Sequence, residues 1–186
     1  PTIMSLTETP VCNFGEKIKN FSLRSTDEKQ LTLADIQGPK GTLIMFICNH
    51  CPYVQAIMQE TVEIVNEIKK LGISSVAIMS NDTLRYQEDS FDNMKLFKKK
   101  YNISFPYLFD ETQEIAKSYG AVCTPDFFGY NKDGELQYRG RVRELKHLTP
   151  VMEKESELLL AMKMIASTNK GPLQQYPSMG CNIKWK

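Results

Sequence analysis

The chain has 186 residues, of which 41% are hydrophobic and 24% are charged, and its formal net charge is +1. This length predicts a single domain over residues 1–186 that buries a core without needing disulfides. The composition excludes a disordered chain, a collagen-like fibre and a small disulfide scaffold. The balanced charge provides no overall field that would attract nucleic acid, so we expect no nucleic-acid partner.

The sequence contains no membrane-spanning pattern. Its longest apolar run, Leu43 to Cys48, is far shorter than the roughly 20 residues that a spanning helix needs. The N-terminal residues lack the basic start and apolar centre of an intact signal peptide. We therefore expect a cytoplasmic protein with no membrane partner, although a start at Pro1 is compatible with a removed leader.

Strand and helix patterns alternate through the first part of the chain. Residues 1–20 are mixed and predict an irregular arm, and a polar turn inside 21–33 predicts a hairpin. The apolar run 42–48 predicts a strand buried on both faces. A helical spacing of apolar residues follows over 54–71, and 75–79 predicts a second buried strand.

The second part of the chain predicts further helices and an antiparallel hairpin. Asp133-Gly134 indicates the hairpin turn. Thr149-Pro150 has the pattern of a helix start. The remaining predictions are a helix over 90–101, a strand over 105–109, a helix over 111–119 capped by Asp110, a helix from 149 to about 167, and an irregular tail over 168–186. This order predicts an α/β fold in which helices cover both faces of a mixed sheet.

The cysteines carry the main chemical signal. There are five, at irregular spacings, and only Cys48 and Cys51 form a C-x-x-C pair. A single C-x-x-C is half of a structural zinc site, so redox chemistry is the better interpretation. We expect no organic cofactor and no resident metal, because a dithiol itself carries the electrons.

The position of the pair explains why it would react. Cys48 ends the predicted buried strand, and Cys51-Pro52 fits the start of the following helix. The positive end of that helix would stabilise a thiolate on Cys48. Cys51 could then resolve a mixed disulfide formed at Cys48. A positive charge on His50 would make the disulfide more oxidising.

This strand–C-x-x-C–helix unit resembles the thioredoxin fold. The run from Gly120 to Phe128 resembles the loop of that superfamily in which a cis proline, here Pro125, faces the active-site disulfide. The N-terminal hairpin and the long segment before Pro125 resemble the peroxiredoxin-like and TlpA-like branch, a bacterial thioredoxin family of AhpC/TSA type, over about residues 10–165. The resemblance implies a thioredoxin-like α/β/α fold with a core over about 10–167 and an N-terminal hairpin extension.

The resemblance also implies an activity. It predicts a thiol–disulfide oxidoreductase with catalytic residues Cys48, His50, Cys51 and Pro125. Its partners would be a protein or small-molecule disulfide or thiol as substrate, and a thiol reductant or oxidant. Cys123 and Cys181 are candidate additional thiols, the latter as a second resolving cysteine in a mobile tail.

Three departures from these families bear on the mechanism. Asn49-His50 stands where thioredoxin has Gly-Pro, and Thr42 stands at the position of its buried aspartate, so no proton acceptor is assigned. Met45 stands where the peroxiredoxin signature P-x-x-x-T-x-x-C has threonine, which argues against direct peroxidase activity.

Two other functions are compatible with the sequence. One is a copper- or metal-binding chaperone on the same fold, because two thiolates suit Cu(I). The other is a thiol peroxidase that uses Cys48 without the usual signature. The alternating residues Arg139, Arg141 and Arg143 are expected to be exposed on a strand.

Overall fold

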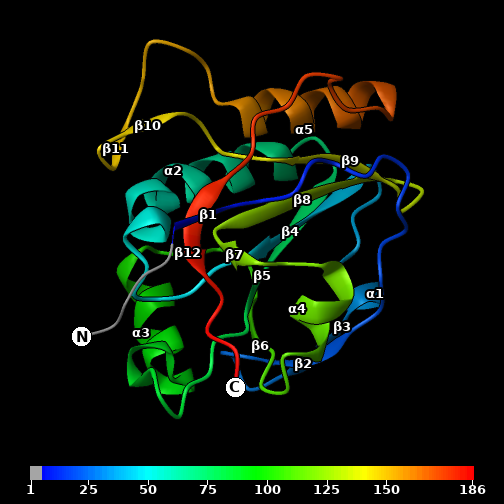
Figure 1. Cartoon of the computed structure of the whole chain (residues 1–186). Coiled ribbons are helices and arrows are strands. Elements are labelled where there is room, and N and C mark those ends of the chain that lie inside the picture. The colour runs from blue at the N-terminus through cyan, green and yellow to red at the C-terminus, as the bar shows by residue number, and fades with distance from the viewer. Residues whose placement is uncertain (1–5) are drawn as a thin grey trace.

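The computed structural model describes residues 6–186 and has a seven-stranded mixed sheet between two layers of helices (Figure 1). The sheet order is β3 (Gln30–Thr32), β2 (Ser22–Ser25), β6 (Tyr107–Phe109), β5 (Ile73–Met79), β4 (Gly41–Phe46), β8 (Asp126–Asn131) and β9 (Leu136–Gly140). Strands β4, β5 and β6 are parallel, whereas β8 is antiparallel to both β4 and β9. The thioredoxin-like α/β fold with its N-terminal hairpin, β2–β3, is as predicted.

The central strand β4 explains the two-layer arrangement. Its side chains alternate between the faces of the sheet, as the pleat requires. Leu43 and Met45 join one hydrophobic core, and Ile44 and Phe46 join the other. The first core lies beneath helices α2 (Pro52–Lys69), α3 (Phe91–Lys100) and α5 (Glu157–Thr168), and the second beneath α1 (Leu33–Ile36) and α4 (Glu114–Tyr119).

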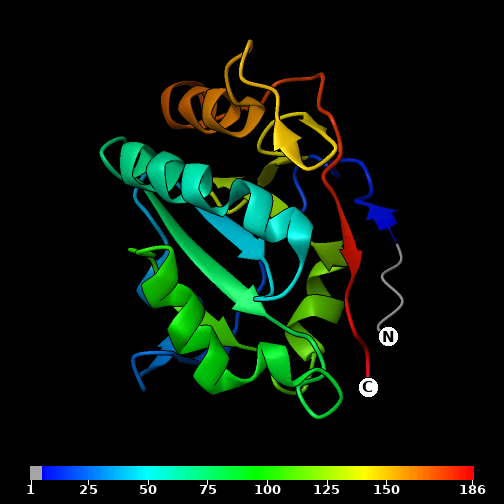
Figure 2. The ribbon, with the colours of Figure 1, turned by 90° about the vertical axis from the view of Figure 1, so that its left-hand side faces the viewer.

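The C-terminal segment differs from the prediction of an irregular tail. It contains strand β12 (Met179–Asn182), which lies between β1 (Leu6–Glu8) and β7 (Cys123–Thr124) in a separate three-stranded sheet. Residues 6–8 likewise form a strand rather than part of the predicted irregular arm, whose first five residues lie outside the described part of the chain. Figure 2 shows β12 running down one side of the molecule next to the N-terminal strand. Because β12 completes its hydrogen bonds with distant strands, its sequence carries no local pattern.

The predicted helix start at Thr149-Pro150 is wrong. These residues form β11, which pairs with β10 (Leu145–Lys146), and α5 begins at Glu157. The true N-cap is Ser156, whose Oγ accepts a hydrogen bond from Leu159 N at 3.2 Å. A proline lacks an N–H and fits the edge of a two-stranded ladder as well as the first turn of a helix.

Helix α4 also begins later than predicted, at Glu114. Its N-cap is Gln113 rather than the predicted Asp110, although the Asp110 carboxylate accepts hydrogen bonds from Ile115 N and Ala116 N in the first turn. None of the helices within residues 6–186 is long and apolar enough to cross a bilayer.

Candidate active site

The C-x-x-C pair lies where strand β4 gives way to helix α2. Cys51 is the N-cap of α2, and Pro52 takes the first helical position, where its missing N–H costs no hydrogen bond. The carbonyl of Cys51 accepts hydrogen bonds from Val54 N and Gln55 N. The predicted strand–dithiol–helix unit is therefore present.

The Pro125 loop faces the pair. The Thr124–Pro125 peptide bond is cis, as the family resemblance implied. Thr124 Oγ1 lies 3.4 Å from Cys48 Sγ, and the Thr124 carbonyl lies 3.4 Å from Cys51 Sγ. One residue thus contacts both sulfurs, the hydroxyl at Cys48 and the backbone at Cys51. The sequence offered no signal for this role of Thr124 beyond its place before the proline.

A third sulfur completes the cluster. Cys181, in β12, has its Sγ 2.8 Å from Cys51 Sγ. The residue is buried and belongs to an ordered strand, so the expected mobile tail cysteine is instead a fixed neighbour of the dithiol. Within residues 6–186, the two other cysteines form no sulfur hydrogen bond with this cluster, although Cys123 lies in the same ladder next to Thr124. Cys123 is buried, and among the described residues no hydrogen bond involves its sulfur; Cys12 is partly exposed on another surface.

Protonation of the pair differs from the expected thiolate on Cys48. Burial is the largest effect on Cys48, which is only 1% exposed, and it raises the pKa of that thiol. The pKa of Cys51 is lowered, because Cys181 and Cys48 hydrogen-bond to its sulfur and it stands at the N-terminus of α2. Burial therefore opposes the helix dipole at Cys48, an effect that the dipole argument did not include.

Asp89 is the acidic residue that the sequence did not reveal. Its Oδ1 accepts a hydrogen bond from Asn49 N at 2.8 Å, and its Oδ2 accepts one from Asn81 Nδ2 at 2.9 Å. Asn49 is fixed further by Tyr107, whose hydroxyl donates to Asn49 Oδ1 at 2.8 Å. Asn49, between the two cysteines, is thus held by two residues that lie outside the C-x-x-C motif. Asp89 lies in η1 (Gln87–Asp89), just before α3, where an acidic residue looks like an ordinary helix-cap element.

His50 is paired with the same carboxylate. Its Nδ1 lies 2.6 Å from Asp89 Oδ2, and the ring stacks on Tyr86. The carboxylate raises the pKa of His50, which favours the imidazolium. Within residues 6–186, His50 Nε2 has no hydrogen-bond partner.

The same residues could be considered as metal ligands. One donor atom each from Cys48, His50 and Asp89 lies within 4.8 Å of the others. However, both Asp89 oxygens already accept hydrogen bonds from amide groups, and a soft thiolate and a hard carboxylate prefer different metals. The set fits an internal charge network better than a metal centre.

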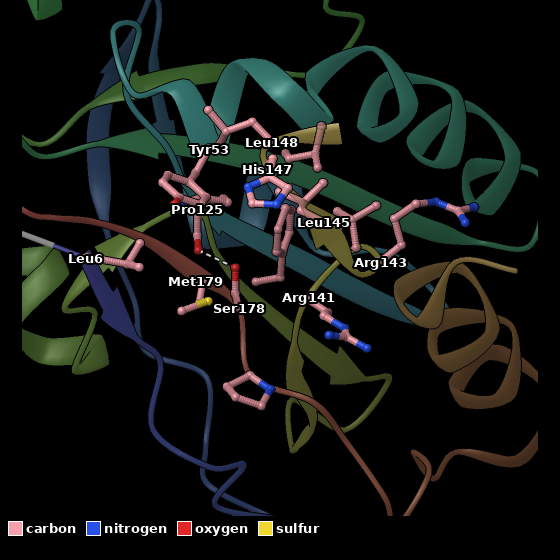
Figure 3. Close-up of a pocket in the computed structure, with 14 residues that line it drawn as sticks. Leu6, Tyr53, Pro125, Arg141, Arg143, Leu145, His147, Leu148, Ser178 and Met179 are labelled. Atoms are coloured by element: carbon pink, nitrogen blue, oxygen red, sulfur yellow. Dashed lines mark hydrogen bonds between the residues drawn. The ribbon is translucent and has the colours of Figure 1, made fainter. Parts of the chain in front are cut away.

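A groove opens next to the Pro125 loop. It has a volume of about 510 Å³, and Figure 3 shows Tyr53, Pro125, His147 and Leu148 around one part of it and Ser178 and Met179 around another. Ser178 Oγ donates to the Pro125 carbonyl at 2.7 Å, the dashed line in Figure 3. None of the three clustered cysteines lines the groove. It therefore offers a docking surface beside the sulfurs rather than direct access to them.

The three arginines near the groove are not the exposed strand residues that were expected. Arg139 is 7% exposed and forms a two-contact ion pair with the buried Asp126, next to Pro125. Arg143 pairs with Glu60 in the same way, and Arg141 with Glu157. Each of the three positive charges is therefore paired with a carboxylate, and these ion pairs anchor the walls of the site.

Comparison with known proteins gives a consistent picture. The model of the AhpC/TSA family matches residues 14–139. A curated relative named thiol-disulfide oxidoreductase ResA, from Bacillus thuringiensis, is 28% identical over 144 residues, or 73% of this chain and 79% of that protein. A rice chloroplastic peroxiredoxin Q is 25% identical over 133 residues, or 67% of this chain and 57% of that protein.

Similarity to solved structures extends along the whole chain, and one example shows this. It is the structure of an uncharacterized conserved protein from Geobacillus kaustophilus, with a TM-score of 0.94 and 38% identity, covering 100% of this chain and 98% of the other. The segment after residue 139, which carries Cys181, lies outside the family match but inside this structural match.

Proposed function

Since the chain belongs to the AhpC/TSA family, whose curated relatives include thiol–disulfide oxidoreductases and peroxiredoxins, we propose that it is a thiol–disulfide oxidoreductase that uses Cys48 and Cys51. The observation that carries the proposal is the dithiol at the start of α2, with both sulfurs against Thr124 and the Pro125 loop. The cysteines supply the electrons, so no organic cofactor takes part.

The proposed reaction is a two-step exchange. Cys48 attacks a substrate disulfide, forms a mixed disulfide with one substrate sulfur and releases the other as a thiol. Cys51 then attacks Cys48 Sγ, so that a Cys48–Cys51 disulfide forms and the remaining substrate thiol leaves. The lowered pKa of Cys51 suits this second step, because the resolving sulfur must be a thiolate to attack. Both steps run in reverse if the protein acts as an oxidant.

Access to Cys48 has to be created. Both cysteines are at most 1% exposed, so a substrate held in the groove must displace part of the cover before it meets the sulfur. Contact with solvent would also reverse the burial that raises the pKa of Cys48, and so activate it. Opening and activation are then the same event, which keeps the dithiol unreactive when no substrate is present.

A redox titration tests the proposal. The protein is equilibrated in glutathione buffers, the free thiols are alkylated and the peptides are mapped by mass spectrometry. We expect a reversible Cys48–Cys51 disulfide with a potential between about −270 and −120 mV, the range of thioredoxin-fold oxidoreductases. Cys48→Ser and Cys51→Ser should abolish reduction of a model disulfide, whereas Cys12→Ser, whose sulfur lies on another surface, should not. Full activity of Cys48→Ser would refute the assignment.

The same samples separate the two alternatives. Rapid consumption of hydrogen peroxide coupled to a thiol reductant would indicate a peroxidase, as the peroxiredoxin Q relatives are named. Stoichiometric binding of Cu(I) by the reduced protein, without disulfide turnover, would indicate a metal-binding function. Met45 in place of the signature threonine disfavours the first alternative.

A further inference from the structure

Strand β12 is built into the candidate site. It pairs with β7, the strand directly before Pro125, so that Cys181 lies opposite Thr124 in the ladder. Both views show it crossing this side of the molecule next to β1 (Figures 1 and 2). A Cβ atom on the neighbouring Gly180 would lie 1.8 Å from the Thr124 carbonyl oxygen, so this approach requires glycine. The C-terminal segment therefore contacts the same residue that contacts Cys48 and Cys51.

The position of Cys181 is fixed on both sides. Before it, the Ser178 hydroxyl bonds to Pro125; after it, Ile183 N donates to Val122 O at 3.0 Å and Lys184 N donates to Asn81 Oδ1 at 2.9 Å. These bonds hold the strand at the Pro125 loop and at the loop after β5. Its sulfur is consequently held against Cys51 rather than brought there by a flexible end.

The distance between the sulfurs is the decisive observation. Cys51 Sγ and Cys181 Sγ lie 2.8 Å apart. A disulfide bond is roughly 2.05 Å long, so the two sulfurs need to approach by only about 0.8 Å to bond. Cys51 thus has a bonding partner on each side, Cys48 through the C-x-x-C spacing and Cys181 through the fold.

We propose, resting on the oxidoreductase function above, that Cys181 is a third redox-active residue that takes over the disulfide from Cys48. Starting from the Cys48–Cys51 disulfide, Cys181 gives up its proton and attacks Cys51 Sγ. The Cys51–Cys181 bond forms, the Cys48–Cys51 bond breaks, and Cys48 leaves as a thiolate that takes the proton. The exchange needs no external oxidant or reductant. It returns Cys48 to the thiol state while the protein stays oxidised.

Peptide mapping distinguishes the two disulfides directly. Cleavage after lysine and arginine leaves Cys48 and Cys51 together in the peptide 41–69, whereas Cys181 lies in 171–184 and Cys123 in 118–132. A Cys48–Cys51 bond closes a loop within one peptide, but a Cys51–Cys181 bond links two peptides. Full-length protein is equilibrated in glutathione buffers, quenched with acid, alkylated and digested.

We expect linked 41–69 and 171–184 peptides as a major oxidised species in the unmodified protein. Cys48→Ala should keep the linked peptides, Cys51→Ala should lose both disulfides, and Cys181→Ala should keep only the loop within 41–69. Cys123→Ala, a buried cysteine in the same ladder, is the matched control and should behave as the unmodified protein. The unmodified protein gives a readout that does not depend on the folding of any variant.

Different results would contradict the relay and the oxidoreductase function. If linked peptides are missing from both the unmodified protein and Cys48→Ala, while Cys181→Ala still forms the Cys48–Cys51 disulfide, the relay is wrong and the oxidoreductase function stands. If none of the proteins forms a disulfide in any buffer, both proposals fail.

Discussion

His50 Nδ1 lies 2.6 Å from Oδ2 of Asp89, a carboxylate with no solvent exposure. The same carboxylate holds the Asn49 amide, and its charge contributes to raising the pKa of Cys48. Asp89, which lies outside the C-x-x-C motif, therefore holds the backbone between the cysteines and raises the pKa of both Cys48 and His50.

Replacing Asp89 with asparagine should lower the pKa of His50, because the largest contribution to its raised value disappears. Proton NMR measures this directly: the chain has two histidines, and His147→Gln assigns the resonances. An unchanged His50 titration in the Asp89→Asn protein would mean that the pair has no electrostatic effect.

The same pair gives stability a definite pH dependence. The unfolded chain loses the His50 proton near pH 6.5, and the folded chain loses it at a higher pH. The stabilisation is therefore complete below about pH 6.5 and is lost as the pH rises through the folded pKa. Urea denaturation of the unmodified protein and of His50→Gln at several pH values should show that the advantage of histidine shrinks over this window.

Thr124 should tune the reactivity of Cys48. Thr124→Val keeps the shape of the side chain but removes the hydroxyl 3.4 Å from Cys48 Sγ, a contact that lowers the pKa of that thiol. A loss of about 1.4 kcal/mol of thiolate stabilisation would slow alkylation of Cys48 roughly tenfold at neutral pH. Thr61→Val, which removes a buried hydroxyl bonded within α2, is the control. Equal alkylation rates in both variants would show that Thr124 has no such role.

The parts of the site that depend on neighbouring residues could be predicted from the sequence. Cys48 and Cys51 are set by the end of one strand and the start of one helix, and Pro125 by the family pattern of its loop. Asp89 lies 40 positions after its partner Asn49 in the sequence, and Cys181 lies 130 positions after its partner Cys51. Contacts of that kind arise from the packing of whole elements, and the residues around them resemble an ordinary helix cap and an ordinary tail.

The protonation of the Cys48–Cys51 pair shows a second limit of prediction from the sequence. Helix dipole and spacing are visible in a sequence, and both favour a thiolate at the start of α2. Burial is not visible there, and it is the largest effect on Cys48. The same omission made Arg139 and Arg143 look like exposed strand residues, whereas each is 7% exposed and paired with a carboxylate.

Arg139 should be needed to keep the Pro125 loop folded. Arg139→Met leaves the Asp126 carboxylate buried without its partner, which typically costs about 3–5 kcal/mol at neutral pH. Arg141→Met breaks the more exposed pair with Glu157 and should cost only about 0–1 kcal/mol. Urea denaturation at pH 7.5 compares the two variants, and equal losses would contradict the role assigned to Arg139.

The pH dependence of Asp126 has the opposite sign to that of an ordinary paired carboxylate. Burial raises its pKa to about 6, above the roughly 3.9 of the unfolded chain. Its contribution to stability is therefore complete below about pH 4 and lost as the pH rises through about 6. The cost of Arg139→Met should accordingly shrink at pH 5, where Asp126 binds a proton more readily. A cost that is the same at pH 5 and pH 7.5 would show that the buried charge is not its cause.

Gly180→Ala tests whether strand β12 covers the dithiol. The new methyl group would overlap the Thr124 carbonyl, so β12 must move away from β7, at a cost of about 1–3 kcal/mol. Cys51 and Cys181 should then be alkylated faster in the folded protein, because the strand no longer shields them. Met179→Ala changes an exposed position of the same strand and should leave both rates unchanged. Mass spectrometry of briefly alkylated protein gives each rate separately, and denaturation curves show that the variant is folded. If Gly180→Ala is folded and both cysteines react as slowly as before, the cover over the dithiol must lie elsewhere, and the segment around Asp89 becomes the part that has to open.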